Sequence, residues 1–230
     1  MVTANLLGGL GNYMFQITAA YGLALDNGDE AIFNINDSQC GHKHLTSYMD
    51  NIFRNLRFVN HPLPIHHTYG EPTFTYTPIT YQPNVKLHGY YQSEKYFIKW
   101  REKILDLYRV DKTTKEYSEK KYNDILHRDF CSLHVRRGDY LGLPNHHPVC
   151  SVEYYKKAMS EMPSGSLFLV FSDDIRWCKE IFTENDIVFI EGNTDYEDMY
   201  LMSMCENNII ANSSFSWWGA WLNENVDKKV

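Results

Sequence analysis

Residues 130–140 read Phe-Cys-Ser-Leu-His-Val-Arg-Arg-Gly-Asp-Tyr. The apolar run at the start of this stretch predicts a strand of a buried sheet, and polar residues follow where the strand ends. In open α/β sheets ligands bind at the carboxyl ends of strands, and the planar, charged arginine side chain suits pairs of phosphate oxygens. Arg136 and Arg137 therefore suggest an anion site. The alternative is a structural ion pair of either arginine with Asp139.

The second half of the chain alternates between predicted strands and helices. Apolar runs predict strands at residues 130–135, 166–171, 187–190 and 209–211. Helices are expected at residues 152–162, 175–182 and 196–207, and a last helix carries Trp217, Trp218 and Trp221. Strands that alternate with helices imply a parallel sheet with right-handed crossovers.

The first residues predict a strand, a glycine-rich turn and a helix. Residues 2–7 are apolar, Gly9 and Gly11 follow, and residues 12–25 predict a helix. Such a turn presents backbone N–H groups and a helix N-terminus to an anion, and glycine lets a ligand come close. Met14 stands where the third glycine of a dinucleotide motif would fall, which makes the NAD signal weak. A tight turn without a ligand is the alternative.

The rest of the first half is less regular. It consists of a strand at residues 31–35, an irregular polar segment at 37–83, a strand at 85–91, an amphipathic helix at 94–108 and a charged helix or linker at 111–121. A boundary within residues 112–128 divides the chain. We therefore predict two α/β halves, residues 1–120 and residues 121–230.

Composition limits the function classes. A chain of 230 residues with 43% hydrophobic residues can form a substantial core. The net charge of −7 argues against a nucleic-acid partner. Five widely spaced cysteines indicate a reducing compartment, and neither a signal peptide nor a transmembrane segment is expected. These observations favour a cytoplasmic protein.

Polar residues follow three strands of the second half, and in a parallel sheet these strand ends share one edge. They are His134, Arg136, Arg137 and Asp139 at the end of the first strand, Asp173 and Asp174 after the second, and Ser213, Ser214 and Ser216 after the last. Arginines would bind a diphosphate, serine hydroxyls and helix N–H groups would add neutral donors, and a carboxylate would take a ribose hydroxyl or a guanine N–H. Together these groups predict a nucleotide-sugar pocket.

Several of these residues have an alternative structural role. Asp174 can instead cap the following helix, and the tryptophans of the last helix are expected in the core. His134 is expected to be a buried orienting group. The loop with Cys40, His42 and His44 is expected to be polar, and no metal site is predicted.

Five motifs in this order resemble those of the α-1,2-fucosyltransferases, glycosyltransferase family 11. They are residues 8–16 (GGLGNYMFQ), 89–94 (GYYQSE), 134–139 (HVRRGD), 171–174 (FSDD) and 212–222 (NSSFSWWGAWL). The resemblance implies an α/β, GT-B-like fold of two Rossmann-type halves with parallel sheets, the acceptor on the first half and the donor on the second. It also implies inverting transfer of L-fucose from GDP-fucose to the 2-hydroxyl of a galactose-containing acceptor, with no metal ion and no cofactor.

The resemblance assigns roles to residues. Arg136 would contact the diphosphate with support from Arg137, Asn12 would lie close to the donor, and Asp139 completes the predicted catalytic set. The predicted donor-binding residues are Gly9, Gly11, Asn12, His134, Arg136, Arg137, Asp173, Asp174, Ser213, Ser214, Phe215 and Ser216. The general base stays open among Asp139, His134, Asp37 and Glu94.

Two departures from the family pattern stand out. Tyr13 replaces the usual glutamine after Asn12, and the family continues past the tryptophan-rich helix with another strand and helix, so we expect the chain that ends at Val230 to be shortened. Two rival functions are an NAD-dependent Rossmann enzyme and a non-catalytic protein that binds carbohydrate or a nucleotide sugar. Paired arginines at a strand end count against a module for neutral glycans.

Overall fold

The computed structural model describes residues 1–40, 43–125 and 129–230. The chain forms two compact units, Met1–Asp111 and Lys112–Val230. The division falls before helix α3 (Lys112–Lys121), at the start of the interval 112–128 in which the sequence placed the boundary, although the predicted first half ran to residue 120. Helix α3 belongs to the second unit because it packs against helix α6 (Asp195–Ser203) of that unit.

The second unit is built on one parallel sheet. Its strands are β8 (Phe130–Val135), β9 (Leu167–Ser172), β10 (Ile187–Phe189) and β11 (Asn207–Ile209), in the order β10-β9-β8-β11. The chain starts in the middle of the sheet at β8, moves outward through β9 to β10, and then returns to the other side of β8 with β11. The strand order therefore reverses between β8 and β11, and such a switch point is where open α/β sheets bind ligands.

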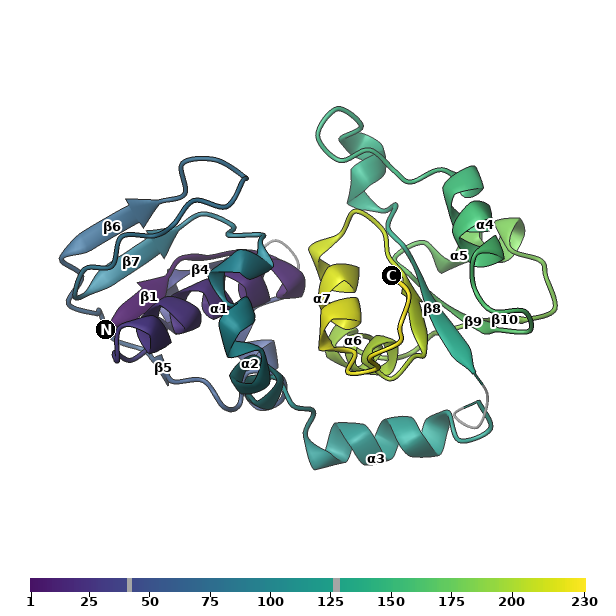
Figure 1. Ribbon diagram of the computed structural model, residues 1–230, viewed down its shortest axis with the longest axis horizontal. Coiled ribbons are helices and arrows are strands. Elements are labelled where there is room, and N and C mark those ends of the chain that lie inside the picture. The colour runs from purple at the N-terminus through teal and green to yellow at the C-terminus, as the bar shows by residue number, and fades with distance from the viewer. Residues whose placement is uncertain (41–42, 126–128) are drawn as a thin grey trace. The chain divides into compact units, whose positions relative to one another are not determined.

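Helices cover both faces of this sheet. Helices α4 (Val152–Ser160) and α5 (Ile175–Ile181) lie on one face, and α6 and α7 (Ser214–Leu222) lie on the other (Figure 1). All six residues of β8 are buried as a result. A strand that is buried on both faces is apolar along most of its length, which is why the sequence pattern located it.

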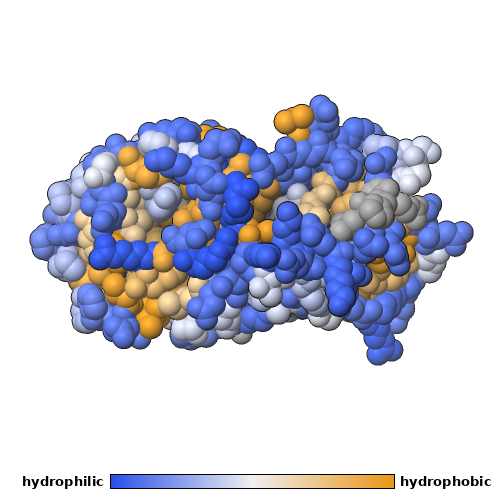
Figure 2. Space-filling model, turned by 90° about the horizontal axis from the view of Figure 1, so that it is seen from below, coloured by the Kyte–Doolittle hydropathy of each residue, from blue (hydrophilic) through white to orange (hydrophobic). Residues whose placement is uncertain are grey.

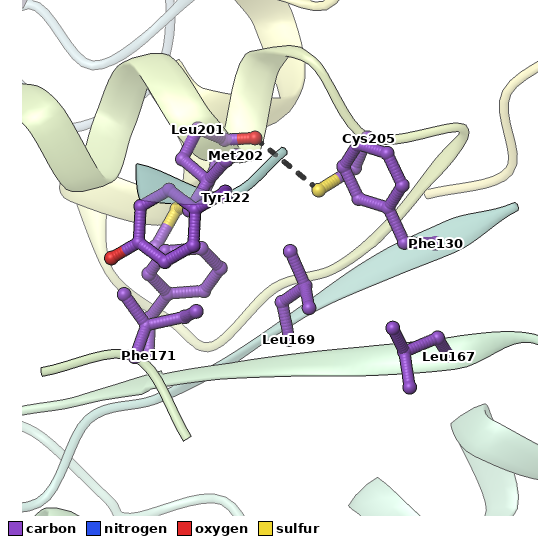
Figure 3. Packing of buried hydrophobic residues seen from close by; sticks show 9 residues of the cluster. Tyr122, Phe130, Leu167, Leu169, Phe171, Leu201, Met202 and Cys205 are labelled. Atoms are coloured by element: carbon purple, nitrogen blue, oxygen red, sulfur yellow. Dashed lines mark hydrogen bonds between the residues drawn. The ribbon is translucent and has the colours of Figure 1, made fainter. Parts of the chain in front are cut away.

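One hydrophobic cluster joins the sheet to α6. Figure 3 shows Leu201 and Met202 of α6 over Leu169 and Phe171 of β9. Burying each such side chain contributes about 1.5–3 kcal/mol to folding. Helix α7 comes close to α6 because Gly219 has no side chain, and a Cβ there would lie 2.9 Å from Met202 Cβ.

The last strand of the second unit differs from the prediction. It begins at Asn207, two residues before the expected start at residue 209, and α6 correspondingly ends at Ser203. Asn208 is fully buried and satisfies its amide internally, donating from Nδ2 to Ser132 Oγ and to the Met202 carbonyl, both at 2.8 Å. Hydrophobic periodicity cannot detect a strand that buries paired asparagines.

The described residues of the first unit form short parallel sheets. The largest has the order β1-β7-β6, with β1 (Val2–Ala4), β7 (Val85–His88) and β6 (His67–Gly70). Two-stranded sheets pair β2 (Leu6–Gly8) with β4 (Ser38–Cys40), and β3 (Phe33–Asn34) with β5 (Phe58–Val59). The helices are α1 (Leu10–Asp26) and α2 (Arg101–Leu107). Short 3-10 turns span Ile35–Asp37, Leu45–Tyr48, Glu94–Tyr96 and Ile98–Trp100, and Asp139–Gly142 in the second unit.

The first unit departs from the prediction at several points. The segment at residues 37–83, expected to be irregular, contains β4, β5 and β6, and the strands expected at 31–35 and 85–91 are shorter, as β3 and β7. The expected strand at residues 2–7 is two short strands with Asn5 between them. The expected helix at residues 94–108 is two 3-10 turns followed by α2, because Phe97 takes a non-helical conformation (φ −148°, ψ −3°). Its buried ring packs 6.2 Å from that of Phe15, so tertiary packing overrides the local helical pattern.

The face of the molecule drawn in Figure 2 mixes polar and hydrophobic areas. Hydrophilic residues predominate on the face seen in Figure 2, and hydrophobic residues emerge in patches. Among the residues the structure describes, no helix has both the length and the apolar character needed to span a membrane.

Candidate active site

Arg136 stands directly after β8 and bridges two carboxylates. Its Nη2 lies 2.6 Å from Asp139 Oδ1, and its Nη1 lies 3.1 Å from Asp173 Oδ2. The guanidinium also lies over the ring of Tyr140, 5.2 Å from its centre. The side chain is 22% exposed. Charge pairs and an aromatic ring thus hold Arg136 at the carboxyl edge of the sheet.

Arg137 is fixed by a separate set of partners. Its backbone N–H donates to Asp173 Oδ1 at 2.9 Å, and its Nε donates to Asp174 Oδ2 at 3.2 Å. The guanidinium stacks on Trp177, 3.8 Å from the ring centre. Asp174 also caps α5 by accepting the Trp177 backbone N–H at 3.2 Å. The helix-capping role that the sequence suggested for Asp174 is confirmed.

The positive and negative charges of the arginine–aspartate cluster nearly balance one another. The cluster is defined by Arg136, Arg137, Asp139, Asp173 and Asp174, and its formal charge is −1. The structural ion pair between Arg136 and Asp139, which was the alternative to an anion site, is present. An exposed pair contributes only about 0–1 kcal/mol, and Asp139 is 43% exposed. A diphosphate can replace such a carboxylate at low cost.

Gly138 keeps the cluster tight. A Cβ at this position would lie 2.4 Å from Asp173 Oδ2. Any larger residue would push Asp173 away from the arginine that it binds. The glycine of the arginine motif therefore has a steric cause.

His134 lies on β8 on the side that faces α7. It is 5% exposed, and its ring centre lies 5.4 Å from that of Phe215. Burial, together with the nearby Arg136 guanidinium, lowers the pKa of the imidazole to about 3. The ring is therefore neutral at physiological pH and is a weak base.

The residues predicted after β11 form the start of α7. Ser213 is the N-cap residue, and Ser214 begins the helix. Ser216 is buried, and its hydroxyl faces the backbone carbonyls of Ser213 at 3.4 Å and Ala211 at 3.5 Å. Ser216 therefore stabilises the turn, while Ser213 and Ser214 are partly exposed on the loop after β11.

The predicted glycine loop lies in the first unit. Gly9 is the N-cap of α1 and Gly11 is buried in its first turn, but the residue with a left-handed backbone is Gly8 (φ +87°). A Cβ on Gly8 would lie 2.5 Å from Asn12 Nδ2. Asn12 in turn accepts a hydrogen bond through Oδ1 from Gln92 Nε2 at 2.9 Å.

Gln16 holds this loop against α1. Its buried side chain accepts the Leu7 N–H at 2.8 Å and donates to the Leu7 carbonyl at 3.2 Å. The amide thus satisfies the backbone of β2 where the strand turns into the helix.

The structure separates the predicted residues into groups. Within the second unit, the arginine–aspartate cluster forms at the end of β8, and His134 of the same strand packs against Phe215 of α7. Among the other base candidates, Asp37 pairs with Lys86 at 2.7 Å. His44 accepts the Thr46 N–H and so caps a 3-10 turn, and His42 lies outside the described residues.

Sequence reasoning missed the aromatic and amide partners of the site. Tyr140 and Trp177 support the two arginines, and Gln92 binds Asn12. The tendency of arginine to stack on aromatic rings was a general signal, but nothing in the spacing indicated which rings would be used.

The fold is that of the GT-B-like glycosyltransferases. The crystal structure of NodZ α-1,6-fucosyltransferase soaked with GDP-fucose superposes with a TM-score of 0.61 at 12% identity, over 96% of this chain and 92% of that one. The family profile described as Glycosyl transferase family 11 matches residues 1–230. The chain belongs to this family, and both the predicted family and the predicted fold class are confirmed.

Two relatives of similar sequence are named for the transfer of different sugars. An alpha-1,2-colitosyltransferase of Escherichia coli is 33% identical, over 96% of this chain and 87% of the relative. A galactoside alpha-(1,2)-fucosyltransferase 2 of Pongo pygmaeus is 28% identical, over 96% of this chain and 68% of the relative.

Proposed function

We propose that the protein transfers L-fucose from GDP-fucose to the 2-hydroxyl of a galactoside, with inversion at the anomeric carbon and without a metal ion. The relative from Pongo pygmaeus is named for this linkage, and the NodZ structure was soaked with this donor. The observation that carries the proposal is the Arg136–Arg137 pair at the carboxyl end of β8, beside the point where strand order reverses. In this proposal the second unit holds the donor and the first unit holds the acceptor.

The chemistry assigns a role to each arginine. As the bond between C1 of fucose and the diphosphate oxygen breaks, negative charge grows on the leaving GDP. Arg136 can exchange its exposed partner Asp139 for the diphosphate and would neutralise that charge. Arg137, which stacks on Trp177, would support it. Backbone N–H groups at the start of α7 would add neutral donors.

The acceptor oxygen would attack C1 from the face opposite the leaving group, which inverts the configuration. The proton of the acceptor hydroxyl passes to a base, and GDP leaves with the electron pair of the broken bond. His134 is a poor candidate for this base because its pKa lies near 3. We assign Asp139 to holding Arg136 in the free protein, where the two are hydrogen-bonded at 2.6 Å, and the diphosphate takes its place when GDP-fucose binds.

A second donor has specific support. The relative from Escherichia coli is a colitosyltransferase, and colitose is L-fucose without its 3-hydroxyl. A GDP-linked colitose donor would differ from GDP-fucose only in that one sugar hydroxyl. A site built for fucose loses a hydrogen bond when it takes colitose, whereas a site built for colitose must bury an extra hydroxyl.

A binding and turnover series tests the proposal. GDP and GDP-fucose should raise the melting temperature of the wild-type protein, and NAD should leave it unchanged. Turnover is measured as GDP released in the presence of lactose, with GDP-fucose and GDP-colitose compared at equal concentration. Stabilisation by NAD alone would restore the dinucleotide alternative, and stabilisation by GDP-fucose without turnover would favour a binding protein.

A further inference from the structure

The carboxyl edge of the sheet in the first unit carries a second group of polar and aromatic residues. Strands β1, β7 and β6 are parallel, so the loops that follow them leave the sheet on the same edge. This is the edge at which α/β sheets bind ligands. The loop after β7 begins at Gly89, and the loop after β6 begins at Glu71.

Glu71 fixes the loop after β7 in a strained conformation. Its carboxylate accepts the backbone N–H of Tyr90 at 2.7 Å and that of Tyr91 at 3.0 Å. Tyr91 has a left-handed backbone (φ +52°), although its ring is fully buried and its hydroxyl donates to the Tyr69 carbonyl at 3.0 Å. A bulky residue persists in such a conformation only where its surroundings over-determine it, and strain of this kind clusters at ligand sites.

The strained turn holds an aromatic pair at the surface. The ring of Tyr90 stacks on that of Phe74, with centres 6.4 Å apart and planes inclined by 20°. Phe74 is 79% exposed. An exposed aromatic face held by a braced turn is a surface that a ligand with an apolar face can cover.

Uncharged amides also follow strands β1 and β7 at this edge. Gln92 follows Tyr90 by two residues and donates to Asn12, and Asn5 hydrogen-bonds His88 at 2.8 Å. Amides both donate and accept, which suits sugar hydroxyls. The edge thus combines aromatic rings with amides, whereas the corresponding edge of the second unit carries arginines. The first combination fits a neutral glycan and the second fits a diphosphate.

We propose that Phe74 and Tyr90 form an aromatic platform for the second sugar of a neutral galactoside acceptor. The C–H groups of a pyranose face would pack on the ring faces, where the negative quadrupole attracts them. Gln92 and Asn12 mark where the galactose that receives the transferred sugar lies. Tyr90 lies two residues before Gln92 in the sequence. Two residues of chain span at most about 7 Å, which is roughly the length of one sugar ring. The inference rests on the proposed transfer to a galactoside.

The test compares lactose with methyl β-galactoside, which lacks the second sugar. For Phe74→Ala, kcat/KM with lactose should fall roughly 2- to 12-fold, the range expected for one aromatic contact, while kcat/KM with methyl β-galactoside and the KM for GDP-fucose stay unchanged. Phe74→Tyr should restore the preference for lactose. The matched control is Tyr117→Ala, which removes a 40% exposed aromatic side chain from α3. It should leave kcat/KM unchanged with both lactose and methyl β-galactoside.

A second readout does not depend on catalysis. Irradiating the aromatic protons of the wild-type protein should transfer saturation to the glucose protons of lactose, and Phe74→Ala should lose that transfer. Turnover with an unchanged lactose preference in Phe74→Ala would overturn the platform while the proposed function stands. Saturation transfer without any turnover would leave the platform in place and overturn the proposed function. Absence of saturation in the wild-type protein would contradict the platform directly.

Discussion

Replacing Arg136 by alanine separates its catalytic role from its structural one. Loss of one group that stabilises charge in the transition state typically costs about 10²–10³ in kcat. The stability cost should be small, because the ion pairs of Arg136 are partly exposed and contribute about 0–1 kcal/mol each. For a chain of this size that corresponds to a fall in Tm of roughly 2–4 °C per kcal/mol.

The assay is GDP release from GDP-fucose with lactose as acceptor, at saturating donor. Arg136→Lys keeps the charge but loses the planar fork, so its kcat should lie between those of the wild type and Arg136→Ala. Arg109→Ala is the matched control, because Arg109 Nη2 also binds an aspartate at 2.6 Å but belongs to the first unit. A folded Arg136→Ala variant with kcat within about threefold of the wild type would remove Arg136 from the mechanism.

Three further predictions concern other parts of the molecule. Asp139→Asn removes the carboxylate that competes with the diphosphate for Arg136, so GDP should bind up to about fivefold more tightly by calorimetry, and weaker binding would contradict the exchange of Asp139 for the diphosphate. Burial raises the pKa of Asp198 from 3.8 to about 7, so the folded state keeps a proton that the unfolded state releases. Wild-type stability should therefore lose up to about 1.4 kcal/mol per unit as pH rises between these values, and the excess stability of Asp198→Asn in urea should be largest at pH 8 and vanish near pH 4. Identical pH profiles would refute that pKa. Gln16→Leu leaves the N–H and carbonyl of Leu7 unpaired and should destabilise the protein by roughly 2–4 kcal/mol in urea, and a cost below 0.5 kcal/mol would show that Leu7 finds other partners.

The sequence predicted the second unit better than the first, for a physical reason. Strand β8 is buried along its whole length, so its apolar residues and its polar end were both visible in the pattern. In the first unit β3 has two residues, and β6 begins with an exposed histidine. Strands that short have no periodicity to detect, and only the completed sheet defines them.

Some features of the candidate site could likewise be predicted from the sequence, and others could not. The ends of parallel strands must share an edge, so the meeting of Arg136 with Asp173 could be predicted. The backbone conformation of the glycine loop could not, and the left-handed residue is Gly8, whereas the sequence pointed to Gly9 and Gly11. Which glycine the turn requires depends on how Asn12 packs beneath it, and this is fixed only in the folded unit.

The position of the transferred sugar tests the central claim most directly. The wild-type protein is incubated with GDP-fucose and lactose in the presence of EDTA, and the product is examined by NMR for the linkage and its anomeric configuration. We predict a single α-linked fucose on the 2-hydroxyl of galactose, formed at the same rate with and without EDTA. A fucose on any other hydroxyl, or a reaction that stops when divalent ions are removed, would contradict this account.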